Sequence, residues 1–147
     1  SITHPNVTGS KKSFRGAEYV GAIHKKEEMN KFRGRHLIID AYGVQSKKLK
    51  DRKSLMHLLE DLPVQLKMRI LKKPTIGKIA SEGYPDWGYS GFVILYESHI
   101  SFHTCPEEHY VAMDIYSCKE FDEKAALTHL KTYFGSTKFK IKSIVRG

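Results

Sequence analysis

The chain has 147 residues, of which 40% are hydrophobic and 28% are charged, and its formal net charge is +9. This length supports one domain with a hydrophobic core, and the composition excludes wholesale disorder. No apolar run approaches the roughly 18 residues of a membrane-spanning helix, so we expect no membrane partner. The chain does not open with a charged segment followed by an apolar one, and we expect a cytoplasmic protein.

Residues 1–33 are expected to form a basic, partly flexible extension, because they are polar and show little periodicity. Residues 1–53 hold 13 basic and 5 acidic side chains, against 12 and 11 in the remainder of the chain. A segment this basic could bind phosphate groups. Because little aromatic interleaving accompanies the charges, we favour a solvated lysine-rich surface and expect no nucleic-acid partner.

A globular domain is predicted over residues 34–147, and it begins with a strand and a helix. Residues 36–42 (HLIIDAY) are apolar and predict a buried strand. Leucines at near-helical spacing predict a helix within residues 47–63, which should end near Leu62 because Pro63 disfavours the helical conformation of the residue that precedes it. A short strand is then expected near Met68–Leu71.

Residues 73–91 are rich in turn-forming and aromatic residues. They predict a long loop or a short hairpin, and long loops in compact domains often carry function. Three apolar runs follow at short spacing, at residues 92–96, 100–104 and 110–117. This spacing predicts an antiparallel meander.

Asp122 is predicted to cap a helix over residues 123–134, and Gly135 to end that helix. A last strand is expected around Phe139 and Ile141. The order of the elements predicts an α+β fold, an antiparallel sheet with two helices on one face. The other face would remain uncovered, and dimerisation through it into a four-layer αββα sandwich would bury it.

Reactive side chains are concentrated between Gly88 and Cys118, more densely than a pattern of strands requires. The two cysteines, Cys105 and Cys118, are too few for a disulfide framework, and we expect them to be reduced. The spacing of His99 and His103 suits a zinc site on a helix, but both fall on a predicted strand, so we expect no metal. The sequence GYSG has only part of a hydrolase nucleophile elbow, and no peptidase signature surrounds Cys118.

Several short motifs between residues 34 and 147 form a specific combination. The motifs are GRHLIIDAYG at 34–43, DWGYSGFVIL at 86–95, ESHIS at 97–101, HT at 103–104, PE at 106–107, Asp114, SC at 117–118 and FDEKAALTHLKTYFG at 121–135. Together they resemble the prokaryotic S-adenosylmethionine decarboxylases, the small pyruvoyl-dependent class. Their combined spacing is a far more specific signal than any one short motif.

The resemblance implies that the chain is a proenzyme that cuts itself between Glu97 and Ser98. The Ser98 hydroxyl would attack the Glu97 carbonyl, and elimination would leave dehydroalanine, which hydrolyses to a pyruvoyl cofactor. The products would be a β chain, residues 1–97, and an α chain, residues 98–147. By the same resemblance, His103 is the base for elimination, Ser90 assists processing, and Cys118 is the acid that reprotonates the substrate carbon.

The chemistry needs residues of these types. Decarboxylation of an α-amino acid leaves a carbanion, so an electron acceptor is required, and a pyruvoyl ketone supplies one after forming a Schiff base with the substrate amine. The reprotonating acid must hold its proton near neutral pH, which suits an ordinary thiol with a pKa of about 8.5.

Substrate binding is expected to involve the residues that match the family's adenosine site. Glu107 matches a glutamate that holds the ribose hydroxyls, and Tyr84 and Trp87 lie near the position of an adenine-stacking aromatic residue. The family usually has an aromatic residue where this chain has Cys105. The substrate would be S-adenosylmethionine and its product the aminopropyl donor for spermidine, with the cleaved chains forming a homodimer of αβ units that share active sites at the interface.

Two alternatives remain open from the sequence. A pyruvoyl-dependent arginine or ornithine decarboxylase would use the same chemistry, and Cys105 with Glu108 could fit a cationic substrate that lacks adenine. A non-catalytic basic binding module would explain the charge of the first 53 residues.

Overall fold

The structure, a computed structural model, describes residues 31–80, 86–135 and 138–147. Most of the predicted basic extension therefore lies outside the described residues. The strands and helices below belong to a unit that runs from Arg33 to Arg146. No helix in the described part of the chain is long and apolar enough to cross a membrane.

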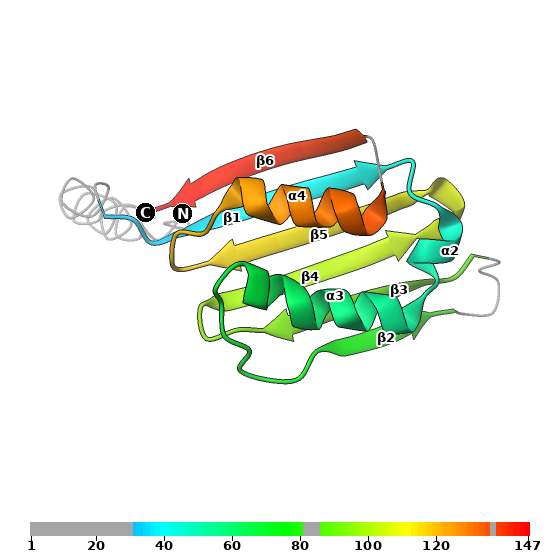
Figure 1. Ribbon diagram of the computed structural model, residues 1–147, viewed down its shortest axis with the longest axis horizontal. Helices are drawn as coiled ribbons and strands as arrows, with labels where there is room; N and C mark the ends of the chain where they lie inside the picture. Colours follow the sequence, from blue (N-terminus) through cyan, green and yellow to red (C-terminus); the bar gives the residue numbers. More distant parts are fainter. Residues whose placement is uncertain (1–30, 81–85, 136–137) are drawn as a thin grey trace, which may run out of the picture. The chain divides into compact units, whose positions relative to one another are not determined.

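Six strands of the described chain form one sheet in the order β2-β3-β4-β5-β1-β6, and every neighbouring pair is antiparallel (Figure 1). Their bounds are β1 Gly34–Tyr42, β2 Thr75–Ile79, β3 Gly88–Ile94, β4 Ser98–Cys105, β5 Tyr110–Ser117 and β6 Lys138–Arg146. The run β3-β4-β5 confirms the predicted meander.

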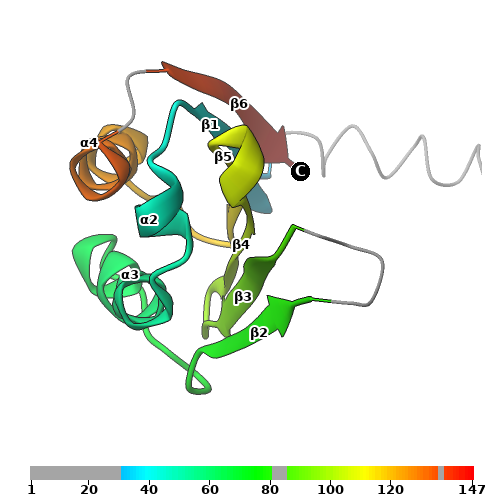
Figure 2. The same cartoon turned by 90° about the vertical axis from the view of Figure 1, so that its right-hand side faces the viewer.

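The helices lie on one face of the sheet, as Figure 2 shows. They are α2 Ser46–Leu49, α3 Arg52–Gln65 and α4 Glu123–Phe134, and a 3₁₀ turn, η1 Pro106–Glu108, follows β4. This arrangement confirms the predicted α+β fold, with α3 and α4 as the two helices. On the opposite face, which we call the open face, Phe92 and Ile94 of β3 are 44% and 37% exposed.

The core lies between the sheet and the helices, and alternate strand residues enter it. In β1, for example, Leu37, Ile39 and Ala41 are buried, whereas the residues between them are not fully covered. Burial of each large apolar side chain contributes roughly 1.5–3 kcal/mol, so the alternation fixes the face that each residue takes. In β4 the same alternation buries Ile100 and Phe102 and leaves His103 on the open face.

The predicted ends of α4 are confirmed. The Asp122 side chain accepts a hydrogen bond of 3.0 Å from the Ala125 N–H, which satisfies one of the unpaired donors of the first turn. Gly135 ends the helix in the left-handed conformation, with φ of 60°.

The predicted single helix within residues 47–63 is wrong in two respects. The segment divides into α2 and α3, because Asp51 leaves the helical conformation and caps α3 by accepting a hydrogen bond from Ser54 N–H. Moreover, α3 continues past Pro63 to Gln65. Proline removes only its own N–H, and the helix is carried on by the bond from Leu66 N–H to the Leu62 carbonyl, 3.0 Å.

Two other expectations concern the segments around β2. The strand expected near Met68–Leu71 is wrong, because the described chain has only an isolated bridge between Ile70 and Leu95 there. Lys67 turns the backbone with φ of 59°, and Met68 N–H bonds back to the Pro63 carbonyl, so this segment follows the end of α3. For residues 73–91, the hairpin interpretation is confirmed by the pairing of β2 with β3.

Candidate active site

The Glu97–Ser98 peptide bond lies in the tight turn between β3 and β4. Ser98 has φ of 153°, in a region that residues other than glycine seldom adopt. Such a conformation costs of order 1–3 kcal/mol and persists only where surrounding contacts impose it. One of these contacts is the hydrogen bond that Leu95 N–H donates to the Ser98 carbonyl, 2.9 Å.

Cys118 is adjacent to this bond because of the register between β4 and β5, in which Ser98 pairs with Ser117. The main-chain N–H of Cys118 donates a hydrogen bond of 2.8 Å to the Glu97 carbonyl oxygen. A fixed N–H donor at a carbonyl stabilises the negative charge that develops on oxygen when a nucleophile attacks the carbon. The geometry therefore favours acyl transfer at Glu97.

The Glu97 side chain has an anchoring role. It is only 5% exposed, and its carboxylate accepts a hydrogen bond from the Arg69 main-chain N–H (3.0 Å) and another from Arg69 Nε (3.3 Å). The Arg69 main-chain bond is the first cause of the lowered pKa of Glu97, followed by burial, which opposes it, and by the Arg69 side chain. A buried carboxylate that stays ionised fixes the residue that precedes the peptide bond.

Ser90 and His103 form a second pair, on β3 and β4. The two residues are partners in the strand register, and Ser90 Oγ lies 2.7 Å from His103 Nδ1. Both side chains lie on the open face, where a hydroxyl held against an imidazole can exchange a proton with a bound group.

The structure does not bring these two pairs together within one chain. Ser98 and His103 lie on the same strand, five positions apart, which corresponds to roughly 17 Å. Proton transfer needs contact within about 3 Å, or one bridging water. The four residues therefore form two half-sites, Ser98 with Cys118 and Ser90 with His103.

Glu107 and Trp87 line a pocket of about 250 Å³ at the far end of β4 from Ser98, beside Cys105. The pKa of Glu107 is raised, first by a hydrogen bond with Asp86 and then by burial. The Trp87 ring has the ammonium groups of Lys50 and Lys78 above it, at 5.2 and 4.3 Å. Tyr84, the other predicted aromatic contact, lies outside the described residues.

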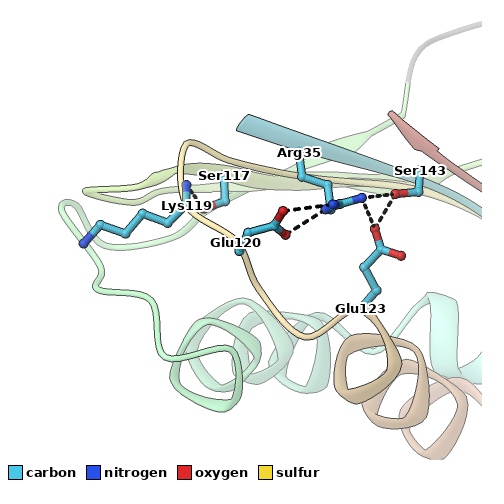
Figure 3. A network of polar contacts seen from close by, with 6 residues as sticks. All are labelled: Arg35, Ser117, Lys119, Glu120, Glu123 and Ser143. Carbon is cyan, nitrogen blue, oxygen red and sulfur yellow. Dashed lines mark hydrogen bonds and ion pairs between the residues drawn. The ribbon is translucent and has the colours of Figure 1, made fainter. Parts of the chain in front are cut away.

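A second cavity, of about 350 Å³, lies beside the Glu97–Ser98 bond on the helix side and is lined by Glu97, Ser117 and residues of the loop before α4. The Ser117 hydroxyl accepts a hydrogen bond of 3.0 Å from Lys119 N–H, which fixes the turn that carries Cys118 (Figure 3). Glu120 then accepts two hydrogen bonds of 3.0 Å from Arg35 of β1. These contacts hold the Cys118 turn against the sheet.

Sequence reasoning missed three residues that hold the turns in place, namely Arg69, Arg35 and Glu120. Each acts through main-chain atoms or through pairing with a residue distant in sequence, and such pairing leaves no local signal. No group of three or more possible metal-ligating side chains is present among the described residues.

Three comparisons with known proteins agree. The family model described as S-adenosylmethionine decarboxylase matches residues 35–147. An S-adenosylmethionine decarboxylase proenzyme of Clostridium botulinum is 34% identical over 118 residues, covering 80% of this chain and 97% of the relative. A proenzyme of the same name from Thermoplasma volcanium is 36% identical over 119 residues, covering 78% of this chain and 84% of the relative. The crystal structure of the adenosylmethionine decarboxylase from Aquifex aeolicus superimposes with a TM-score of 0.64 at 26% identity, covering 80% of this chain and 92% of that one.

Proposed function

The chain belongs to the S-adenosylmethionine decarboxylase family, and from this premise we propose that it matures by cutting its own backbone between Glu97 and Ser98. It is an enzyme that decarboxylates S-adenosylmethionine, in polyamine biosynthesis. Membership of this family favours that substrate over arginine or ornithine, and it favours catalysis over a role as a basic binding module.

The proposed cleavage proceeds in three steps that this chain's own atoms carry. Ser98 Oγ attacks the Glu97 carbonyl carbon and the C–N bond breaks, giving an ester and a free amine on residue 98. A base then removes the Cα proton, and the Cβ–O bond breaks to release Glu97 as a carboxylate. The resulting dehydroalanine tautomerises, and one water hydrolyses it to a pyruvoyl group and ammonia.

The main support for this proposal is the backbone conformation and hydrogen bonding at the Glu97–Ser98 peptide bond. Ser98 is strained with φ of 153°, and the Glu97 carbonyl oxygen accepts the Cys118 N–H bond of 2.8 Å. Strain raises the free energy of the intact peptide, and the N–H donor lowers that of the tetrahedral intermediate. Both effects favour acyl transfer at this position over other serines.

The residues at this position fit a pyruvoyl group, because its precursor serine opens β4 beside a free, exposed cysteine. The pyruvoyl ketone supplies the electron acceptor that α-decarboxylation requires. Cys118 would then deliver the proton to the substrate carbon, and Ser90 would assist His103 in the earlier elimination. We also propose a cytoplasmic location, since a free thiol persists in a reducing compartment.

The separation of the two half-sites supports a homodimer of αβ units. A two-fold axis set across the middle of β4, with the open faces together, would bring the Ser98 end of one copy to the His103 end of its partner. The exposed Phe92 and Ile94 of β3 would be buried by the same contact, giving the αββα sandwich. In this arrangement the partner's Glu107 and Trp87 would also lie nearer the pyruvoyl group, where they would hold the adenosine.

A Ser98→Ala variant tests the proposal. We expect it to remain one chain on a denaturing gel and to release no carbon dioxide, while the wild-type protein gives two fragments and decarboxylates S-adenosylmethionine. Arginine and ornithine should give no product with either. Cleavage of the variant, or activity without cleavage, would contradict the proposed maturation.

A further inference from the structure

The backbone just before the cleavage site is held by a separate piece of chain, residues 69–72, which we call the strap. Tyr96 N–H donates to the Arg69 carbonyl (3.0 Å), Leu71 N–H donates to the Ile94 carbonyl (2.9 Å), and Ile70 bridges to Leu95. None of these contacts uses the Glu97–Ser98 peptide bond. They are therefore expected to survive its cleavage.

Arg69 also holds the residue that becomes the chain end. Its main-chain N–H and its Nε bind the two carboxylate oxygens of Glu97, at 3.0 and 3.3 Å, and the Glu97 side chain is buried. Its guanidinium group lies 4.7 Å from the centre of the Tyr96 ring, which adds a cation–π contact to the same turn. Arg69 therefore contacts both Tyr96 and Glu97.

Given the proposed self-cleavage, we propose that Arg69 is a positioning residue that keeps the new carboxyl terminus at Glu97 against Cys118 in the mature enzyme. The Glu97 carbonyl oxygen already accepts the Cys118 N–H bond of 2.8 Å in the uncut chain. Cleavage gives this carbon a second oxygen, the former Ser98 Oγ, and a negative charge. The existing bond becomes charge-assisted and stronger, provided that the chain end stays where it is.

The position of Cys118 in the mature enzyme depends on contacts from two sides. The Cys118 turn is held from one side by Ser117 and by the Arg35–Glu120 pair, and in Figure 3 the Lys119 side chain extends away from that network. On the other side the Cys118 turn is held by the Glu97 end. If that end left, Cys118 would lose its main-chain partner and its fixed position relative to residue 98.

The test compares Arg69→Met with Lys72→Met, a control at an exposed lysine of the same strap. Both proteins are allowed to cleave to completion, and hydrogen exchange is followed by mass spectrometry in peptides covering residues 94–97 and Cys118. We expect exchange at both places to be about tenfold faster in Arg69→Met and unchanged in the control, because the variant keeps the main-chain N–H bond but loses the bond from Arg69 Nε to the buried Glu97 carboxylate. The value of kcat should fall several-fold, with global thermal stability little changed. A third variant, Arg69→Lys, keeps the charge and should restore part of the protection.

The inference fails if cleaved Arg69→Met and Arg69→Lys both match the Lys72→Met control in exchange and in kcat. If Arg69→Met does not fold, the same comparison between Arg69→Lys and the control decides, with faster exchange at residues 94–97 expected. These failures differ from failure of the proposed function, in which the wild-type chain itself would not cleave.

Discussion

The main-chain N–H of Cys118 donates a hydrogen bond of 2.8 Å to the carbonyl oxygen of Glu97. This contact joins the bond that we expect to be cut to the residue that we expect to donate the proton in turnover. Because the two residues are 21 positions apart, only the pairing of β4 with β5 brings them together. The same backbone contact therefore links maturation and catalysis.

Replacement of Ser98 by glycine should reveal the strain at the cleavage site. Neither Ser98→Gly nor Ser98→Ala can cleave, so both can be studied as intact chains. Glycine accommodates φ of 153° without strain. We therefore expect the free energy of unfolding in urea to be about 1 kcal/mol higher for Ser98→Gly than for Ser98→Ala. Ser101 lies on the same strand and has an ordinary backbone conformation. As a control, Ser101→Gly should be less stable than Ser101→Ala. Equal stability of the two Ser98 variants would show that the turn is not strained.

Loss of the Glu97 charge should destabilise the protein at neutral pH but not in acid. The pKa of Glu97 is lowered, mainly by the Arg69 main-chain N–H, from an ordinary value of 4.5. The stabilisation is thus fully present above that value and is lost as the pH falls through the folded-state pKa. In the uncut Ser98→Ala background, Glu97→Gln should cost about 2 kcal/mol of unfolding free energy at pH 7.

Unfolding measured from pH 7 to pH 3 checks this prediction, and the difference between the two proteins should shrink as the pH falls below the ordinary carboxyl pKa of 4.5. Glu60→Gln, at an exposed carboxylate of α3, is the control and should show little difference at any pH. A Glu97→Gln difference that persists unchanged into acid would mean that packing, and not charge, anchors this side chain.

If each active site uses residues of both chains, two different inactive variants should restore processing when they form a mixed dimer. Ser98→Ala lacks the nucleophile and His103→Ala lacks the base, so neither alone should yield a pyruvoyl-blocked α fragment. When the two are co-expressed, the His103→Ala chain should be processed, because its partner supplies His103. Co-expression of Ser98→Ala with Cys118→Ala should restore no turnover, since Ser98 and Cys118 belong to the same half-site. Processing of His103→Ala alone would contradict the role of His103 as the base, and absence of processing on co-expression would contradict shared sites.

An acidic residue at Phe92 should dissociate the dimer. Phe92 lies on the open face and is 44% exposed, so Phe92→Glu would bury an unpaired charge in the proposed interface. We expect sedimentation to show a folded monomer that does not mature. Val64→Glu, at a residue of α3 that is 63% exposed, should remain dimeric and active. A Phe92→Glu protein that stays dimeric would place the interface elsewhere.

Local signals in the sequence predicted most of the fold. The cap at Asp122, the stop at Gly135 and the apolar runs of β1 and β5 depend on neighbours within a few positions. Pro63 misled the prediction, because the lost hydrogen bond falls in the last turn of α3, where the cost is small. The division of α2 from α3 depended on Asp51, whose capping role was not recognised.

The candidate site was less predictable because it depends on pairing between distant segments. The motifs named Ser98, His103 and Cys118, but the periodicity of β4 did not say which of them would meet. Strand register decides that Cys118 contacts Glu97 and that His103 contacts Ser90. Arg69 meets Glu97 through main-chain and side-chain bonds that span 28 positions of the sequence, so no local pattern pointed to it.

Intact-mass measurement of the freshly purified wild-type chain tests self-cleavage most directly. We predict two fragments, residues 1–97 and 98–147, of which the smaller lacks a free amino terminus and reacts with hydrazines. Their summed mass should equal that of the uncut chain plus one water minus one ammonia. A single unbroken mass after prolonged incubation, with no carbonyl at residue 98, would contradict the account.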